Sequence, residues 1–184
     1  TSLGDTIHID AGTYVQQVYV DNKSVAIIGA GTGQTIIKPP PGGVYKANDI
    51  GGWALMKIWN GSTGSVSNLT LEGPGESCGS PGTLGSPYML DYGFLIEGST
   101  TYWNMTNVEA LSIRDTPLSS CQHGGGARYR AGSHGTVNGF TASDYQKSGF
   151  IASATGTEVS ASNLDITGTV EAPLAQLGMQ ISSG

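Results

Sequence analysis

The feature that most constrains the fold is a pair of short sequence marks that recurs along the chain. In each pair a strand-like segment is followed, 14 positions later, by a small polar residue or glycine: 54 to 68, 93 to 107, 125 to 139 and 149 to 163. The distance from one pair to the next varies, at 39, 32 and 24 residues. A fixed inner spacing with a variable outer spacing predicts stacked coils in which one corner accepts insertions.

The marks have the periodicity of strands and not of helices. Apolar and small polar residues alternate over four to six positions, as in Val66–Leu71, and the gaps are rich in Gly, Ser, Asn and Thr. We therefore predict an all-β chain that folds as a parallel β-helix, with long loops inserted at one corner. At about 20–30 residues per coil, this length gives roughly six to seven coils in a single domain over residues 1–184.

The opening segment is similar to a known superfamily. The run GDTIHIDAGTYVQQVYVDNKSVAIIGAGTGQTIIKPP (residues 4–40) resembles the first coils of right-handed parallel β-helix proteins of the pectin-lyase-like superfamily. Residues 148–169 and 173–184 are also similar to coils of that superfamily. The resemblance implies a right-handed, single-stranded parallel β-helix, and it points to no closer family and no single activity.

Both ends of the chain lack the usual solenoid caps, because strand-like residues lie close to Thr1 and to Gly184. Open strand edges recruit other strands. We therefore expect either a fragment of a longer β-helix or ends that neighbouring chains complete, in a homo-oligomer or filament.

The charge pattern and the distribution of apolar residues argue against nucleic-acid binding and against a membrane span. The net charge is −6 with only 8 Lys and Arg residues, so we expect no nucleic-acid binding, which needs a basic surface. No apolar run reaches the length of about 18 residues needed to span a membrane. A polysaccharide or cell-surface glycan is the partner that we expect.

Two cysteines and four Asn-x-Ser/Thr sequons indicate an extracellular, secreted protein. Cys78 and Cys121 lie in insertions of consecutive coils, whose corners stack about 4.8 Å apart, so a disulfide between them is geometrically plausible. The alternative is two free thiols in a reducing compartment. Asn22 and Asn60 are the sequon asparagines that we predict to carry glycans.

Polar residues of the insertions should converge on one edge of the solenoid, which is our candidate site. Long ordered loops often carry function. The predicted catalytic residues are Lys147, Arg128 and Asp144. The predicted substrate-binding residues are Arg130, Asp91, Tyr145, His123, Trp53 and Trp59.

Two of these assignments have a structural alternative. Arg128 and Arg130 lie two apart on one strand and should face the same side, where they either bind a uronate carboxylate or pair with acidic side chains of adjacent coils. Trp53 and Trp59 either form a sugar-stacking platform or cover the core at a loop, and we favour the second.

The sequence favours a non-catalytic role over an enzymatic one. We expect a structural, adhesive or glycan-binding module, because no recognisable catalytic constellation is present. The alternative is an enzyme that acts on an acidic polysaccharide by pectate-lyase-like β-elimination or by glycoside hydrolysis. We expect no cofactor and no metal, since the histidines are scattered; Ca²⁺ would be needed only in a lyase, where Asp91, Asp115 and Asp144 are candidate oxygen donors.

Overall fold

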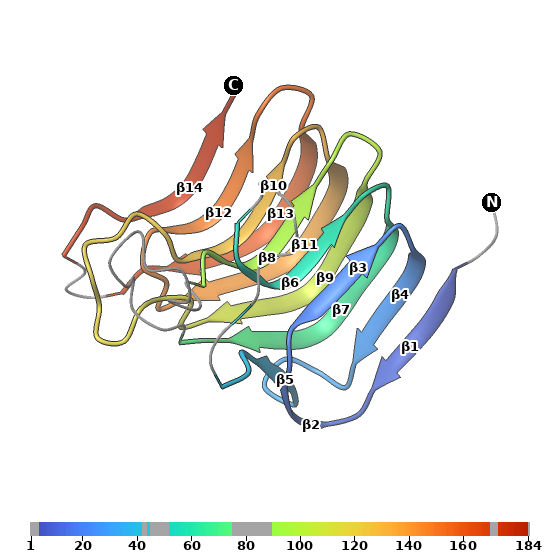
Figure 1. The fold of residues 1–184 in the computed structure, drawn as a ribbon, viewed down its shortest axis with the longest axis horizontal. Helices are drawn as coiled ribbons and strands as arrows, with labels where there is room; N and C mark the ends of the chain where they lie inside the picture. The colour runs from blue at the N-terminus through green and yellow to red at the C-terminus, as the bar shows by residue number, and fades with distance from the viewer. Residues whose placement is uncertain (1–3, 42–43, 45–51, 75–89, 170–172, 184) are drawn as a thin grey trace.

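The computed structural model of the chain describes residues 4–41, 44, 52–74, 90–169 and 173–183. These residues form 14 strands and no helix, so none of them crosses a membrane as a long apolar helix. Every strand pairing among them is parallel. Successive coils lie side by side from the blue end to the red end of the molecule, which confirms the predicted parallel β-helix (Figure 1).

The strands belong to two sheets that the chain visits in turn. The eight-stranded sheet contains β1 (Asp5–Ile9), β2 (Gly12–Val15), β4 (Ser24–Gly29), β5 (Thr35–Lys38), β7 (Thr63–Glu72), β9 (Tyr102–Leu111), β11 (His134–Ser143) and β13 (Glu158–Thr167). The six-stranded sheet contains β3 (Val18–Asp21), β6 (Ala54–Trp59), β8 (Tyr92–Glu97), β10 (Gly125–Arg130), β12 (Ser148–Ser153) and β14 (Leu177–Ser182).

The second mark of each sequence pair is a bend within a long strand. β7, β9, β11 and β13 each have 10 residues, and each contains one residue with φ between 50° and 74° at the position of the second mark. These residues are Asn68 (φ 58°), Asn107 (φ 50°), Gly139 (φ 74°) and Asn163 (φ 54°). Asn and Gly adopt this conformation at the lowest cost, so the sequence repeats them where each coil turns.

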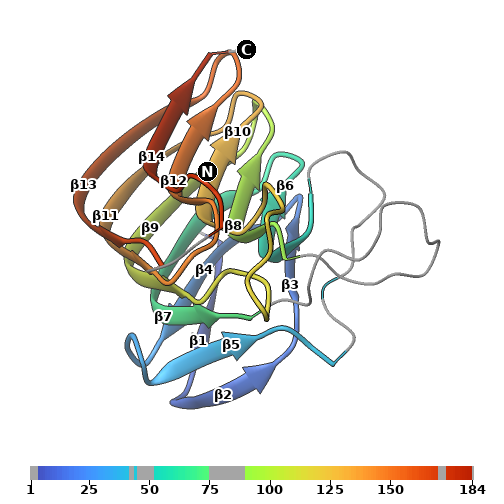
Figure 2. The same cartoon turned by 90° about the vertical axis from the view of Figure 1, so that its left-hand side faces the viewer.

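The variable connections all lie at one corner, as predicted. The corner that leads from the six-stranded to the eight-stranded sheet is short in every coil: residues 22–23, 60–62, 98–101, 131–133 and 154–157. The opposite corner carries connections of very different length: residues 39–53, 73–91, 112–124, 144–147 and 168–176. Figure 2 shows the strands of the two sheets side by side, with β6, β8 and β10 in one sheet and β7, β9 and β11 in the other.

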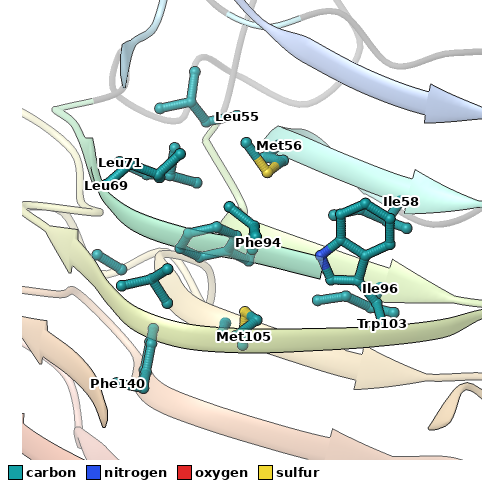
Figure 3. Close-up of a cluster of buried hydrophobic side chains, with 14 of the residues drawn as sticks. Leu55, Met56, Ile58, Leu69, Leu71, Phe94, Ile96, Trp103, Met105 and Phe140 are labelled. Carbon is teal, nitrogen blue, oxygen red and sulfur yellow. The ribbon is translucent and has the colours of Figure 1, made fainter. Parts of the chain in front are cut away.

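Apolar side chains stack in register between the two sheets. On the six-stranded sheet Met56, Phe94, Ala127 and Phe150 are consecutive partners on β6, β8, β10 and β12. Phe140 on β11 packs against this stack from the other sheet, and its ring centroid lies 6.4 Å from that of Phe94 (Figure 3). Its ring centroid lies 5.8 Å from that of Phe150. Because residues at equivalent positions of successive coils stack on one another, each coil buries its apolar side chains against the next. This packing fixes the strand register.

The end coils expose positions that are buried elsewhere. Ile7 pairs with buried Ile27 yet is 49% exposed, and Ile181 pairs with Ala152 of the β12 ladder yet is 77% exposed. The inner ladders therefore reach both end coils of the described structure.

Candidate functional site

A polar pocket lies on the outer face of the six-stranded sheet, beside the loop-bearing corner. Its volume is about 180 Å³. β8, β10, β12 and β14 supply its floor, and the two connections that precede β10 and β12 supply its wall. The lining residues are Tyr92, Gln122, His123, Gly125, Arg128, Lys147, Ser148, Ile151 and Gln180.

Arg128 projects from the centre of the floor. It is in register with Leu95 and Ile151 and alternates with the buried Ala127 and Tyr129, so it must point outward. Its Nε donates to Ser153 Oγ at 3.0 Å, and its Nη1 donates to the Tyr92 hydroxyl. Two of the five guanidinium N–H groups are thereby used to fix the side chain, which leaves three to meet a ligand.

Lys147 stands at the rim of the pocket, in the short connection between β11 and β12. Its Nζ donates to the carbonyl oxygen of Ala175 at 3.0 Å in an exposed position. The backbone holds the residue on both sides, because Lys147 N donates to Gly124 O and Leu177 N donates to Lys147 O, each at 2.9 Å. The Lys147 ammonium group is therefore exposed at the rim, while hydrogen bonds fix the backbone of the residue.

His123 forms the wall together with a buried carboxylate. His123 Nε2 lies 2.7 Å from Asp115 Oδ1, and the exposed fractions of the two side chains are 9% and 1%. The other Asp115 oxygen accepts hydrogen bonds from Ser119 Oγ and from Gln146 Nε2. Asp115 is therefore saturated with donors and fixes the orientation of the imidazole ring.

Gln146 attaches the loop that carries this pair to the next coil. Its side chain is fully buried. Its Oε1 accepts from Asp115 N at 3.0 Å, and its Nε2 donates to Cys121 O at 2.9 Å as well as to the Asp115 carboxylate. The Gln146 amide thereby makes hydrogen bonds to residues 115–121 of the kind that an adjacent strand would make in a sheet.

The arrangement around Asp115 does not fit a free metal site. Ligand atoms of Asp115, Cys121 and His123 all lie within 4.8 Å of one another. However, Cys121 is not a free thiol, and Asp115 and His123 are already bonded to each other. Asp91 and Asp144, the other predicted oxygen donors, join no such group among the described residues.

Two predicted site residues in the same connection as Lys147 do not reach the pocket. Asp144 binds Arg114 Nε at 2.7 Å and also accepts from Ser112 and Thr169. Burial raises the pKa of Asp144, but these three hydrogen bonds and the charge of Arg114 outweigh it and hold the pKa below its usual value. Tyr145 is only 2% exposed and packs in the core, so burial raises its pKa.

The Arg128 and Arg130 side chains face the same side, as predicted, but have different surroundings. Arg130 Nε lies 4.0 Å from a carboxylate oxygen of Glu97 on the adjacent coil, and Lys57 Nζ lies 3.5 Å from the other oxygen. Arg130 therefore pairs with an acidic side chain of an adjacent coil, which is the second of the two roles considered above. Arg128 has no carboxylate partner among the residues that the structure describes.

Asp91, Trp53 and Trp59 also lie outside the pocket lining. Asp91 Oδ2 accepts the backbone N–H of Trp53 at 2.9 Å, which ties two neighbouring corners together. Trp53 packs against the core, as favoured above. Trp59 lies on the outer face of β6 beneath the Lys57 ammonium, 5.2 Å from its ring centroid.

The predicted covalent modifications concern other parts of the surface. Asn22 and Asn60 are exposed at the short corner, both with a left-handed backbone, and Asn60 Nδ2 donates to Asp21 at 2.9 Å. Cys78 lies outside the described residues, so the disulfide with Cys121 stays a prediction.

Sequence reasoning thus brought together His123, Arg128 and Lys147 but missed several of their neighbours. Tyr92, Gln122, Ser148 and Gln180 line the pocket, and Asp115 orients His123. Strand register could have identified Tyr92, Ser148 and Gln180. Tyr92 and Ser148 are both partners of Gly125 on neighbouring strands, and Gln180 belongs to the row of Arg128 and Ile151. Asp115 carries no such signal, since it lies in an irregular loop.

Comparison with known proteins adds no assignment: no family model matches this chain, and no curated protein matches it at a significant level.

Proposed function

We propose that the protein is an extracellular β-helix module of the pectin-lyase-like superfamily that binds an acidic sugar of a polysaccharide in the pocket around Arg128. The fold and the resemblance of the opening coils support the superfamily. The polar pocket beside the variable loops supports glycan binding, because such loops carry recognition on a rigid scaffold.

One observation carries the choice of an acidic sugar. Among the described cations, Lys38, Lys57, Arg114 and Arg130 each lie within 4.0 Å of a carboxylate. Arg128 and Lys147 have no such partner in the described part of the chain, and both line the same pocket. In a protein of net charge −6, this pocket is where an anion finds uncompensated positive charge.

The geometry of Arg128 suits a uronate carboxylate. A planar guanidinium with unused N–H groups binds a carboxylate through two parallel hydrogen bonds. The volume of about 180 Å³ suits one sugar ring of a longer chain and not a large ligand. Tyr92 and Gln180 offer a hydroxyl and an amide for the ring hydroxyls of that sugar.

Calorimetry with oligouronates tests this proposal. Wild-type protein should bind at least one member of a series prepared from pectin, alginate and glycosaminoglycans, and should not bind the carboxyl-reduced form of the same oligosaccharide. Arg128→Gln and Lys147→Gln should each weaken binding about tenfold or more, since a hydrogen bond to a charged group contributes about 1.5–3 kcal/mol.

Lys23→Gln is the matched control, because Lys23 is an exposed cation at the opposite corner. It removes the same charge and should leave the affinity unchanged. Equal binding of the carboxyl-reduced sugar, or an equal loss in the Lys23 variant, would contradict the proposal.

An extracellular location also makes covalent predictions. We propose a Cys78–Cys121 disulfide, supported by the finding that Cys121 is not a free thiol, and glycans on Asn22 and Asn60, supported by their exposure. Intact mass spectrometry before and after reduction with alkylation, and before and after enzymatic deglycosylation, tests both. Association of copies through the end coils stays a prediction, and sedimentation of the protein over a range of concentrations tests it.

A further inference from the structure

Three outward side chains of β9 combine an N-glycosylation sequence with an aromatic residue. Strand alternation buries Trp103 and Met105 and turns Tyr102, Asn104 and Thr106 to the outer face of the eight-stranded sheet. Asn104 and Thr106 form a sequon, and Tyr102 lies two positions before its asparagine. In the other three sequons an aliphatic residue occupies that position: Val20, Ile58 and Val66.

The Asn104 side chain is fixed by its oxygen and leaves its nitrogen for modification. Asn104 Oδ1 accepts hydrogen bonds from Thr136 N and from Thr136 Oγ1, each at 2.9 Å. Because a backbone N–H only donates, the amide atom that faces it must be the oxygen. Asn104 is exposed, and its Nδ2 has no hydrogen-bond partner in the described part of the chain. A glycan on Nδ2 leaves Oδ1 unchanged, so both hydrogen bonds survive the modification.

Tyr102 is a fixed and exposed aromatic surface next to Asn104. Its ring stacks on His134 of β11, with ring centroids 4.8 Å apart and planes inclined by 13°, yet the residue is 54% exposed. Its partner on the other side is Thr63 of β7, whose short side chain covers much less of a ring. Residues two apart on a strand are separated by about 6.6 Å, which a single sugar ring on Asn104 spans.

The face around Asn104 has room for sugars. A hollow of about 700 Å³ is lined by Tyr102, Asn104, His134 and Thr136 together with residues of β13. This volume is within the range of ligand-binding hollows, about 300–1,000 Å³. The neighbouring positions in the same rows carry small hydroxyl side chains, which leave the space above the sheet open: Ser65, Ser67, Ser160 and Ser162.

We propose that Asn104 carries an N-linked glycan whose first N-acetylglucosamine packs its C–H face on the Tyr102 ring. This rests on the extracellular location proposed above and is independent of the acidic-sugar pocket. The donor is a lipid-linked oligosaccharyl diphosphate of the secretory pathway. The Asn104 Nδ2 lone pair forms the bond to C1 of the first sugar, the C1–O bond breaks with its electrons on the diphosphate, and an Nδ2 proton passes to a base of the transferase. In the folded protein the sugar then covers the exposed aromatic ring and stabilises the fold.

Peptide mass spectrometry of the protein secreted by its natural source tests the modification. Peptide N-glycosidase in heavy-oxygen water converts a glycosylated asparagine to a labelled aspartate. Asn104 should gain the label relative to an incubation without enzyme, and Asn163, an exposed asparagine outside any sequon, should not. A label at Asn22 or Asn60 without one at Asn104 overturns this inference and leaves the extracellular location standing. No label at any of the three overturns both.

Thermal unfolding tests the packing on Tyr102. Wild type, Thr106→Ala, Tyr102→Thr and the double variant are produced in a eukaryotic secretory host, and the form with the Asn104 glycan is purified wherever the sequon is intact. Thr106→Ala removes the glycan without touching the ring, and threonine at 102 matches Thr63 in the same row. Loss of the glycan should lower the melting temperature by about 2–4 °C more in the presence of Tyr102 than in its absence. Equal shifts in the two backgrounds would overturn the packing.

Discussion

Replacing Gln146 by alanine should loosen the loop that holds the His123–Asp115 pair. The Gln146 side chain is buried and is bonded to Asp115 through both ends of its amide, and it also donates to Cys121 O. Alanine removes all of these bonds at once and leaves the Asp115 N–H and part of its carboxylate without partners. The backbone of a neighbouring strand does not replace these hydrogen bonds, because the Gln146 side-chain amide is the group that holds this part of the loop to the next coil.

The expected cost follows from the groups that are left unpaired. Each buried polar group that is left without a hydrogen-bond partner costs about 1–3 kcal/mol. We take about 3 kcal/mol for the whole change, because the lost hydrogen bonds share atoms and their costs do not simply add. In a domain of this size each kcal/mol lowers the melting temperature by about 2–4 °C, so the expected shift is about 6–12 °C.

Differential scanning calorimetry at neutral pH measures this shift. Gln122→Ala is the matched control, because Gln122 lies in the same loop but is exposed and, among the described residues, donates to Ser120 O alone, at 3.3 Å. Its effect should stay within about 0.5 kcal/mol. Equal melting temperatures for Gln146→Ala and Gln122→Ala would show that the loop is held by other contacts and would refute this account of the site wall.

Three further predictions concern other parts of the fold. Tyr129→Phe should cost about 1 kcal/mol in denaturant unfolding, because it removes the buried 2.7 Å hydrogen bond from the Tyr129 hydroxyl to Trp103 O; no loss would contradict that bond. Asp144→Asn should destabilise the protein at neutral pH, and the difference from wild type should shrink as the pH falls below the ordinary aspartate pKa of 3.8. The sign follows because the folded-state pKa is lowered, so the carboxylate contributes above the unfolded pKa and its contribution is lost on acidification; a pH-independent difference would count against it. Asn107→Val should cost at least about 1 kcal/mol in thermal unfolding and Asn107→Gly clearly less, because a β-branched residue is strained at φ 50°; equal effects would be evidence against a bend-forming role.

The architecture was predictable because strand alternation and left-handed bends are local properties of the sequence. Phe94 and Phe150 each follow the first mark of a pair, at 93 and 149, so the spacing places them in equivalent coils, and the structure pairs both with Ala127 in one inner ladder. The constant 14-residue interval has a simple origin, since it joins the start of a strand on one sheet to the bend residue on the next, such as Asn107.

The site was predictable only where strand geometry decides side-chain direction. Arg128 alternates with buried residues on β10, so its outward direction follows from the pattern. Asp144 and Lys147 lie in one short corner, where no alternation operates, and one binds Arg114 while the other reaches the pocket. The pairing of Asp115 with His123 depends on the path of a 13-residue connection (112–124), which local sequence rules do not determine.

A crystal structure of the protein with its tightest-binding oligouronate tests the central claim most directly. We predict that a sugar carboxylate lies within hydrogen-bond distance of the Arg128 guanidinium. A saccharide bound on the eight-stranded sheet, or one in the pocket with its carboxylate directed away from Arg128, would contradict the proposed site.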